Sequence, residues 1–160
     1  KDGGLRTGDL GHLDEDGYLY ITGRVKEQYK LENGKYVAPA PLEESLKLSA
    51  FIEQVMLFGV NRPFNIALIV AAMPAVEQFA KENNISGSGD VLLGQGPIKE
   101  LFKNQLEKYG KDFKGFERPQ NFTLLSEEWG VDNGMLTPTL KLKRDFVEGK
   151  FKAQIEGLYS

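Results

Sequence analysis

The sequence contains no cysteine and a single histidine, His12, among its 160 residues. A chain without cysteine has no disulfide framework, no thiolate nucleophile and no cysteine-rich zinc site, and this composition fits a reducing compartment such as the cytoplasm. A lone histidine with no second histidine or cysteine to share a metal is a poor ligand, so we expect His12 to be a solvated or core-edge side chain. We therefore predict no protein-bound metal.

The sequence also lacks a large surplus of charge of one sign, because it contains 20 basic and 23 acidic residues and its formal net charge is -3. This balance gives no broad field that would attract nucleic acid or an anionic membrane, so we expect no nucleic-acid partner. The longest apolar runs, such as residues 66–73, are too short to cross a bilayer. We predict a cytoplasmic protein without a transmembrane segment, and peripheral membrane contact through a part of the protein outside this sequence stays open.

With 41% hydrophobic residues the chain has enough apolar material for one domain with a real core. Apolar runs at residues 55–60 and 66–72, separated by a turn signal, predict the central sheet. Helix signals cover residues 42–48, 74–84, 98–109 and 143–158, with a short strand at 121–125 and a loop at 127–136. In the last helix we expect Phe146, Val147 and Ile155 to face inward. The mixture predicts an α+β fold with a small mixed or antiparallel sheet flanked by helices and preceded by a β-hairpin.

The first candidate site lies on the N-terminal hairpin, where Asp14-Glu15-Asp16-Gly17 has the chemistry of a tight chain reversal. This reversal would bring Asp9 near Arg24. A carboxylate accepts hydrogen bonds from two vicinal hydroxyls and a guanidinium donates to phosphate oxygens, so the pair suits a ribose phosphate. The alternative for Asp9 is an ordinary turn or N-cap carboxylate.

Two further turns carry candidate residues. The Asn33-Gly34 step favours a positive φ and predicts a hairpin or loop tip. Near the C-terminus, Pro138 is expected to keep the backbone extended, so that Lys141 projects its ammonium into a neighbouring cleft. The alternative for Lys141 is a solvated basic turn before a helix.

These segments together resemble the closing motifs of the adenylate-forming superfamily, which contains acyl-CoA synthetases, peptide-synthetase adenylation domains and luciferases. The motifs are TGD at residues 7–9, GRVKE at 23–27, a glycine turn followed by Val-x-Pro-x-x-x-Glu, and LTPTLKLKR at 136–144. The last motif and the spelling KEQYKLENGKYVAP at 26–39 look like the long-chain fatty acyl-CoA ligase branch. The resemblance implies that residues 1–25 end a large N-terminal adenylation domain and that residues 26–160 form a mobile C-terminal lid.

The resemblance also implies residue roles. Lys141 would contact the substrate carboxylate and the α-phosphate during adenylation, with Lys143 and Arg144 as rivals for that role. Asp9 and Arg24 would bind the ribose and phosphate of ATP or AMP, and Gly34 would let the pantetheine of CoA pass close to the backbone. Lys26 stands at the hinge, where its alternative is an exposed lysine. We take Glu44 as the closing acid of the glycine-turn motif and interpret it as a structural carboxylate in a first helical turn.

The implied reaction has two steps and uses ATP, Mg²⁺ and CoA. A fatty acid is converted to acyl-adenylate with release of pyrophosphate, and CoA then displaces AMP to give acyl-CoA. The implied partner of the lid is its own large N-terminal domain. Two alternatives remain open, another adenylate-forming ligase for a short-chain or aromatic acid, and a free-standing binding module with the same fold and no chemistry.

Overall fold

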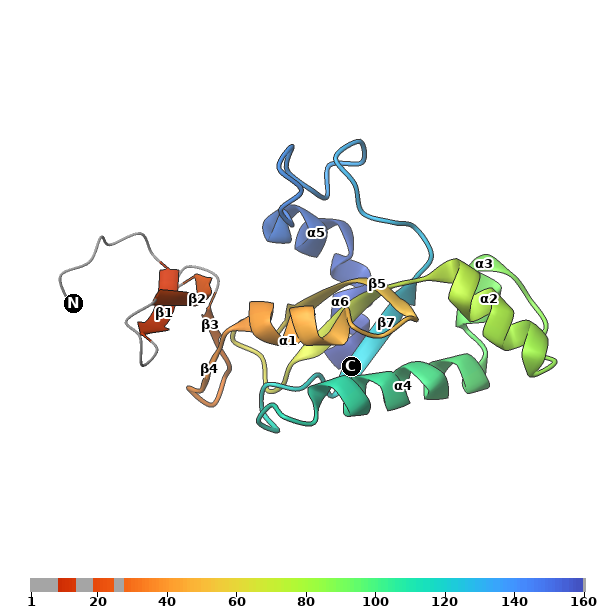
Figure 1. Cartoon of the computed structure of the whole chain (residues 1–160), viewed down its shortest axis with the longest axis horizontal. Coiled ribbons are helices and arrows are strands. Elements are labelled where there is room, and N and C mark those ends of the chain that lie inside the picture. The colour runs from red at the N-terminus through yellow and green to blue at the C-terminus, as the bar shows by residue number, and fades with distance from the viewer. Residues whose placement is uncertain (1–8, 14–18, 25–27, 160) are drawn as a thin grey trace.

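A computed structural model describes residues 9–13, 19–24 and 28–159, the first two segments as backbone only. The elements in chain order are β1 (Asp9–Leu13), β2 (Leu19–Arg24), β3 (Tyr29–Lys30), β4 (Tyr36–Val37), α1 (Pro39–Leu46), β5 (Ile52–Phe58), β6 (Ile66–Ala71), α2 (Met73–Glu82), α3 (Gly89–Leu93), α4 (Gly96–Gly110), β7 (Asn121–Leu125), α5 (Arg144–Lys150) and α6 (Lys152–Tyr159). β1 pairs with β2, β3 pairs with β4, and β5, β6 and β7 form a separate sheet in that order (Figure 1). None of the described helices is both long and apolar enough to cross a membrane.

β6 is the central strand, and all six of its residues are buried. It runs antiparallel to β5 and parallel to β7. A strand covered on both faces requires apolar side chains at every position, which explains the uninterrupted run at residues 66–71. The predicted α+β fold with a small mixed sheet is confirmed.

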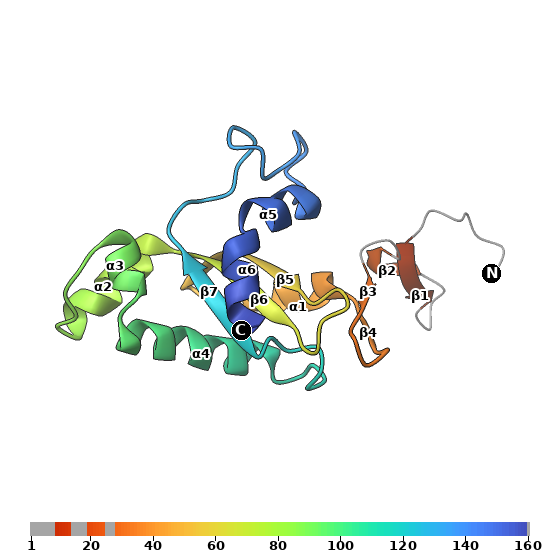
Figure 2. The same ribbon diagram turned by 180° about the vertical axis from the view of Figure 1, so that it is seen from behind.

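Two hydrophobic cores lie on opposite faces of this sheet because successive side chains of a strand point in opposite directions. Ala67, Ile69 and Ala71 of β6 pack with buried residues of α1, α2, α3 and α4. Leu68 and Val70 pack with α5 and α6. Figure 1 accordingly shows α1 in front of the sheet, and Figure 2 shows α6 in front of it from the opposite side.

The small hairpin of β3 and β4 is fastened to the connection between β5 and β6. The Tyr29 hydroxyl donates to Oδ1 of Asn65 at 2.6 Å, and the Glu32 amide donates to the Arg62 carbonyl at 2.8 Å. A Cβ at Gly59 would collide with Oδ1 of Asn65, so only glycine allows this close approach. The hairpin predicted around Gly34 is therefore present and tied to the main sheet.

The predicted helix over residues 143–158 is two helices, because the chain bends at Phe151, which has φ -104° and ψ 23°. Val147 and Ile155 face the core as predicted. The expectation that Phe146 also faces inward is wrong, since its side chain is 46% exposed. Adjacent helical residues point about 100° apart, so Phe146 cannot share the buried face of Val147.

Two further parts of the chain contribute buried residues that the sequence patterns did not indicate. After α2, residues 83–88 lead to the short helix α3, which adds Leu92 and Leu93 to the core. The loop predicted at residues 127–136 has no regular element, yet it buries Trp129 and Met135 against α5 and α6. The burial of these residues depends on tertiary contacts, and no helical or strand periodicity in the sequence indicates it.

Candidate functional site

Lys141 lies on a tight hairpin. Leu136 and Leu142 form an antiparallel bridge, and between them the Leu140 amide donates to the Thr137 carbonyl at 2.8 Å. The Thr137 amide donates in turn to the Lys141 carbonyl at 2.8 Å. The hairpin therefore presents Lys141, which is exposed, at the end of a closed loop.

The expectation that Pro138 keeps this segment extended is wrong. Pro138 follows Thr137, whose carbonyl accepts the turn hydrogen bond, and proline is favoured at this second position because its φ is preset. Leu140, the last residue of the turn, has φ +65°. This left-handed conformation costs a non-glycine residue about 1–2 kcal/mol, and it is typical of a three-residue hairpin loop that ends in a bulge.

The hydroxyl of Thr137 stabilises the turn by hydrogen bonds within residues 137–141. It accepts a hydrogen bond from the Lys141 amide at 3.0 Å and lies 3.0 Å from the Thr139 hydroxyl. The backbone of Lys141 is thereby hydrogen-bonded at both its N–H and its C=O, while the side chain stays exposed.

Three cations follow this turn, and they differ in their partners. The guanidinium of Arg144 forms two hydrogen bonds to Glu43, and the ammonium of Lys143 lies 5.4 Å from the centre of the Phe146 ring. Within the described residues, the ammonium of Lys141 has neither a hydrogen bond nor an ion pair. Arg144 is thus committed to Glu43, Lys143 lies over a ring, and Lys141 is exposed without such a side-chain contact in the described part of the chain.

Glu43, and not Glu44, is the acid that closes the glycine-turn motif. Counting Val-x-Pro-x-x-x-Glu from Val37 ends at Glu43, so careful spacing alone identifies it. Glu43 is buried, at 6% exposure, whereas Glu44 is exposed and pairs with Lys47 at 2.9 Å. The assignment of the motif acid to Glu44 is wrong, and Glu44 also lies beyond the first turn of α1.

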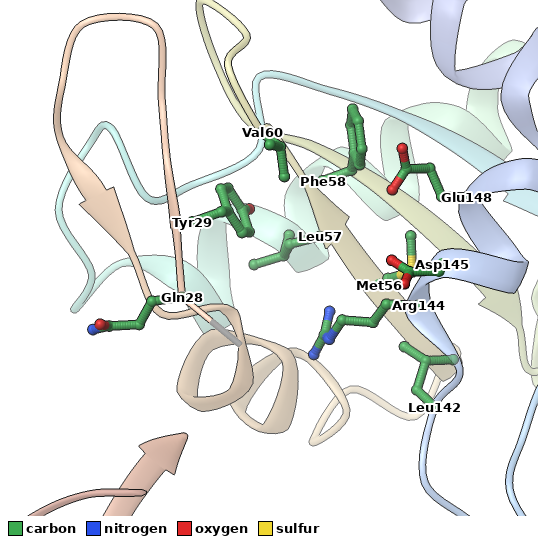
Figure 3. Close-up of a pocket in the computed structure, with 10 residues that line it drawn as sticks. All are labelled: Gln28, Tyr29, Met56, Leu57, Phe58, Val60, Leu142, Arg144, Asp145 and Glu148. Carbon is green, nitrogen blue, oxygen red and sulfur yellow. The ribbon is translucent and has the colours of Figure 1, made fainter. Parts of the chain in front are cut away.

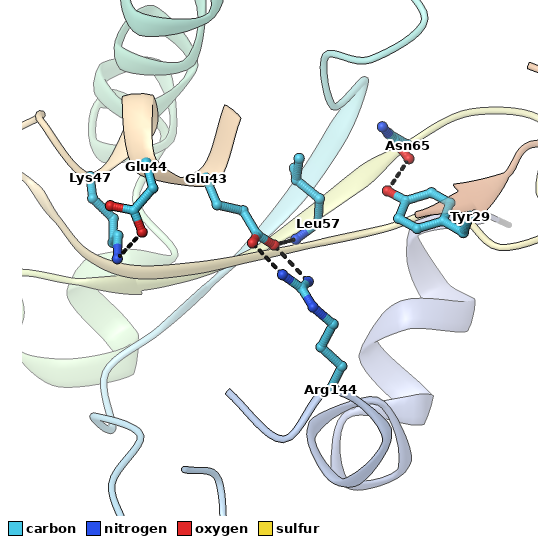
Figure 4. A network of polar contacts seen from close by, with 7 residues as sticks. All are labelled: Tyr29, Glu43, Glu44, Lys47, Leu57, Asn65 and Arg144. Carbon is cyan, nitrogen blue, oxygen red and sulfur yellow. Dashed lines mark hydrogen bonds and ion pairs between the residues drawn. The ribbon is translucent and has the colours of Figure 1, made fainter. Parts of the chain in front are cut away.

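The carboxylate of Glu43 joins three elements (Figure 4). It accepts the backbone N–H of Leu57 on strand β5 at 2.8 Å. It also accepts both arms of the Arg144 guanidinium, at 2.8 Å to Oε2 and 2.5 Å to Oε1. Helix α1, the edge strand β5 and the start of α5 therefore meet at one buried charge.

Gly34 lies in the turn between β3 and β4. Its φ is +88°, and its amide donates to the Leu31 carbonyl at 2.9 Å. A Cβ built at Gly34 would meet no atom within 4 Å among the described residues. The predicted positive φ is confirmed, and the space beside this glycine is open.

The structure pairs Asp9 with Arg24 directly across the β1–β2 ladder. The expected proximity is therefore confirmed for the backbone, and their side chains lie outside the described part. In the same ladder His12 pairs with Tyr20. Lys26, the predicted hinge, is outside the described residues.

A cavity of about 320 Å³ opens beside the Glu43–Arg144 contact (Figure 3). Its lining residues are Gln28, Tyr29, Met56, Leu57, Phe58, Val60, Leu142, Arg144, Asp145 and Glu148. Burial raises the pKa of Glu148, and the charge of Asp145 raises it further. Burial likewise raises the pKa of the Tyr29 phenol, which keeps this hydrogen-bond donor neutral. No sequence pattern indicates this cavity, because its lining combines residues 28–60 with residues 142–148.

Comparison with known proteins identifies the domain type. Residues 26–90 match the family model of the AMP-binding enzyme C-terminal domain. Over these residues the chain is an AMP-binding enzyme C-terminal domain. The resemblance inferred from the motifs is thereby confirmed, since the match begins in the GRVKE motif and includes the Gly34 turn and Glu43.

Relatives of this C-terminal domain extend the similarity to the whole chain. Human long-chain-fatty-acid–CoA ligase 1 is 36% identical over 100% of the chain and 23% of its own length. The ligase FadD15 of Mycobacterium tuberculosis is 37% identical over 99% of the chain and 27% of its own length. The solved adenylation domain of the carboxylate reductase from Mycobacterium chelonae is 26% identical, with a TM-score of 0.78, over 96% of the chain and 22% of that structure. The chain thus spans about a quarter of these proteins.

Proposed function

We propose that this chain is the lid of a long-chain fatty acid–CoA ligase, which activates a fatty acid with ATP and transfers the acyl group to CoA. The observation that carries the proposal is that one small domain presents two turns with complementary chemistry. One turn exposes the cation of Lys141, which has no ion pair among the described residues, and the other leaves open space beside Gly34 in the same part of the chain. Similarity to long-chain ligases over the full chain supports the acid class.

In the first step Lys141 would stabilise the negative charge that builds on the carboxylate and the α-phosphate. A fixed cation acts most strongly on charge that develops in the transition state. Asp9 would accept hydrogen bonds from the ribose hydroxyls, and Arg24 would donate to ribose or phosphate oxygens. The paired positions of these two residues on β1 and β2 support a joint role.

Mg²⁺ would neutralise phosphate charge when it enters with ATP. Among the described residues, no group of three or more histidines, cysteines, aspartates and glutamates could hold a metal ion. We therefore assign no residue of the described part to Mg²⁺.

In the second step the lid would turn so that the Gly34 turn replaces the Lys141 loop at the adenylate. We propose residues 1–25 as the end of the large domain, residues 26–160 as the lid and Lys26 as the pivot between them. Hinges absorb backbone rotation over a few residues, so the side chain at position 26 is secondary. The large N-terminal domain is the proposed partner, and the cytoplasmic location stays a prediction from the cysteine-free composition.

The full-length protein tests the proposal directly. With ATP, Mg²⁺ and CoA, we expect a saturated long-chain fatty acid to release AMP and pyrophosphate and to form its CoA thioester, measured by chromatography of both products. Turnover of acetate or benzoate in preference to the long-chain acid would instead establish another acid ligase. Absence of turnover with all three acids would support the non-catalytic binding module.

The 160-residue chain alone is expected to fold but to bind no ATP. Both hydrophobic cores are complete within it, which predicts a cooperative thermal transition by circular dichroism. Asp9 and Arg24 would hold a ribose only against an adenine pocket of the large domain. Isothermal titration calorimetry should therefore show no saturable heat with ATP, and tight binding would contradict the division into large domain and lid.

A further inference from the structure

The buried ion pair between Glu43 and Arg144 lies at the base of the Lys141 hairpin. We propose that Glu43 and Arg144 are positioning residues for Lys141, so that the pair sets the place of the ammonium during adenylation. This inference rests on the proposed function. It gives Glu43 and Arg144 a role in the reaction that acts through Lys141.

The first argument is the way in which the hairpin is anchored. Its first strand follows Met135, which is fully buried and whose carbonyl accepts the Lys143 amide at 2.8 Å. Its second strand leads within three residues from Lys141 to Arg144, the first residue of α5. One root of the hairpin is therefore held by the core and the other by the ion pair.

The second argument is the rigidity of the ion pair itself. The Glu43 side chain is 8% exposed and is held by the Leu57 amide as well as by both arms of Arg144. A bidentate contact between guanidinium and carboxylate fixes distance and direction together, which a lysine cannot do. The direction in which the chain leaves α5 toward Lys141 is therefore set by α1 and β5.

The third argument is an asymmetry between the two functional turns. The Gly34 hairpin is held by the Tyr29–Asn65 hydrogen bond and by the Glu32–Arg62 backbone contact. Neither contact involves the Glu43–Arg144 pair. Loss of the pair should thus displace the Lys141 loop and leave the Gly34 turn in place.

The test uses Glu43→Gln and Arg144→Gln in the full-length enzyme, with the two half-reactions measured separately. Glutamine at position 43 keeps an acceptor for the Leu57 amide but removes the charge. We expect pyrophosphate exchange to fall roughly ten- to hundredfold, the range that a small misplacement of a catalytic group produces. Thioester formation from supplied acyl-adenylate should be nearly unchanged.

Two control variants separate positioning from general damage. Glu156→Gln removes another ion pair, to Arg62, that lies away from the hairpin, and it should leave both half-reactions unchanged. Ile155→Val weakens the core on the side of α5 and α6 without touching the pair. If Glu43→Gln lowers both half-reactions equally, as lost stability would, the inference is wrong.

A double-mutant cycle with Lys141→Ala gives the decisive reading. If Glu43 acts through Lys141, Glu43→Gln should cost little further adenylation once Lys141 is alanine. Full additivity would overturn the inference. If Lys141→Ala leaves adenylation intact, the proposed function of Lys141 is wrong. If Lys141→Ala slows adenylation but Glu43→Gln does not, only the positioning role of Glu43 is wrong.

Discussion

Lys141→Ala in the full-length enzyme is expected to slow adenylation by roughly two or more powers of ten, the loss typical of a removed transition-state charge stabiliser. The ammonium of Lys141 is exposed at the end of a closed hairpin and has no ion-pair partner among the described residues. Its removal should therefore take away charge without disturbing packing. Pyrophosphate exchange measures this step, and thioester formation from supplied acyl-adenylate should be nearly untouched.

Lys143→Ala is the matched control for Lys141→Ala. Lys143 has the same charge two positions away, but its ammonium lies over the Phe146 ring. We expect this variant to retain adenylation close to the parent rate. An equal loss of both half-reactions in Lys141→Ala, or a larger loss of adenylation in Lys143→Ala, would show that the catalytic cation is misassigned.

Gly34→Leu is expected to produce the opposite pattern. Thioester formation should fall by about tenfold or more, because a side chain would occupy the space proposed for pantetheine, while pyrophosphate exchange persists. No described atom lies within 4 Å of the added Cβ, so the substitution meets no steric clash inside the described part of the domain. The two half-reactions, measured on one preparation, give the comparison.

Backbone strain is the competing explanation for Gly34→Leu, since Gly34 has φ +88°. Gly89→Leu controls for it, because Gly89 has φ +54° and also has open space around its Cβ position. That variant should carry a similar conformational cost and spare both half-reactions. If pyrophosphate exchange falls as far as thioester formation in Gly34→Leu, the lid does not exchange its two turns at one site.

Patterns of neighbouring residues predicted those parts of the fold that depend on interactions between residues close in sequence. The uninterrupted apolar run of β6 indicated a strand of the central sheet, and the Asn33-Gly34 step indicated a positive φ. The spacing of Val147 and Ile155 identified the buried face of the last helices. Each of these signals comes from residues that are close in sequence.

The rest depends on contacts between distant segments, or on local hydrogen bonds that the residue types alone do not determine. Glu43 and Arg144 are 101 positions apart, and no periodicity indicates that they form a pair. Pro138 is compatible with both an extended segment and a turn, and the Thr137 hydrogen bonds decide between them. The break between α5 and α6 falls at Phe151, and the nearby glycine, Gly149, lies inside α5, so its position does not identify the break.

The two faces of β6 carry side chains of different size. Ala67 and Ala71, with Ile69 between them, face the side covered by four helices, whereas Ile66, Leu68 and Val70 face the side covered by two. A slip of β6 by one residue would exchange these sets, so that larger side chains would have to fit at the two alanine positions and voids would be left on the other side. The two alanines therefore help to specify which face of the strand belongs to which half of the domain.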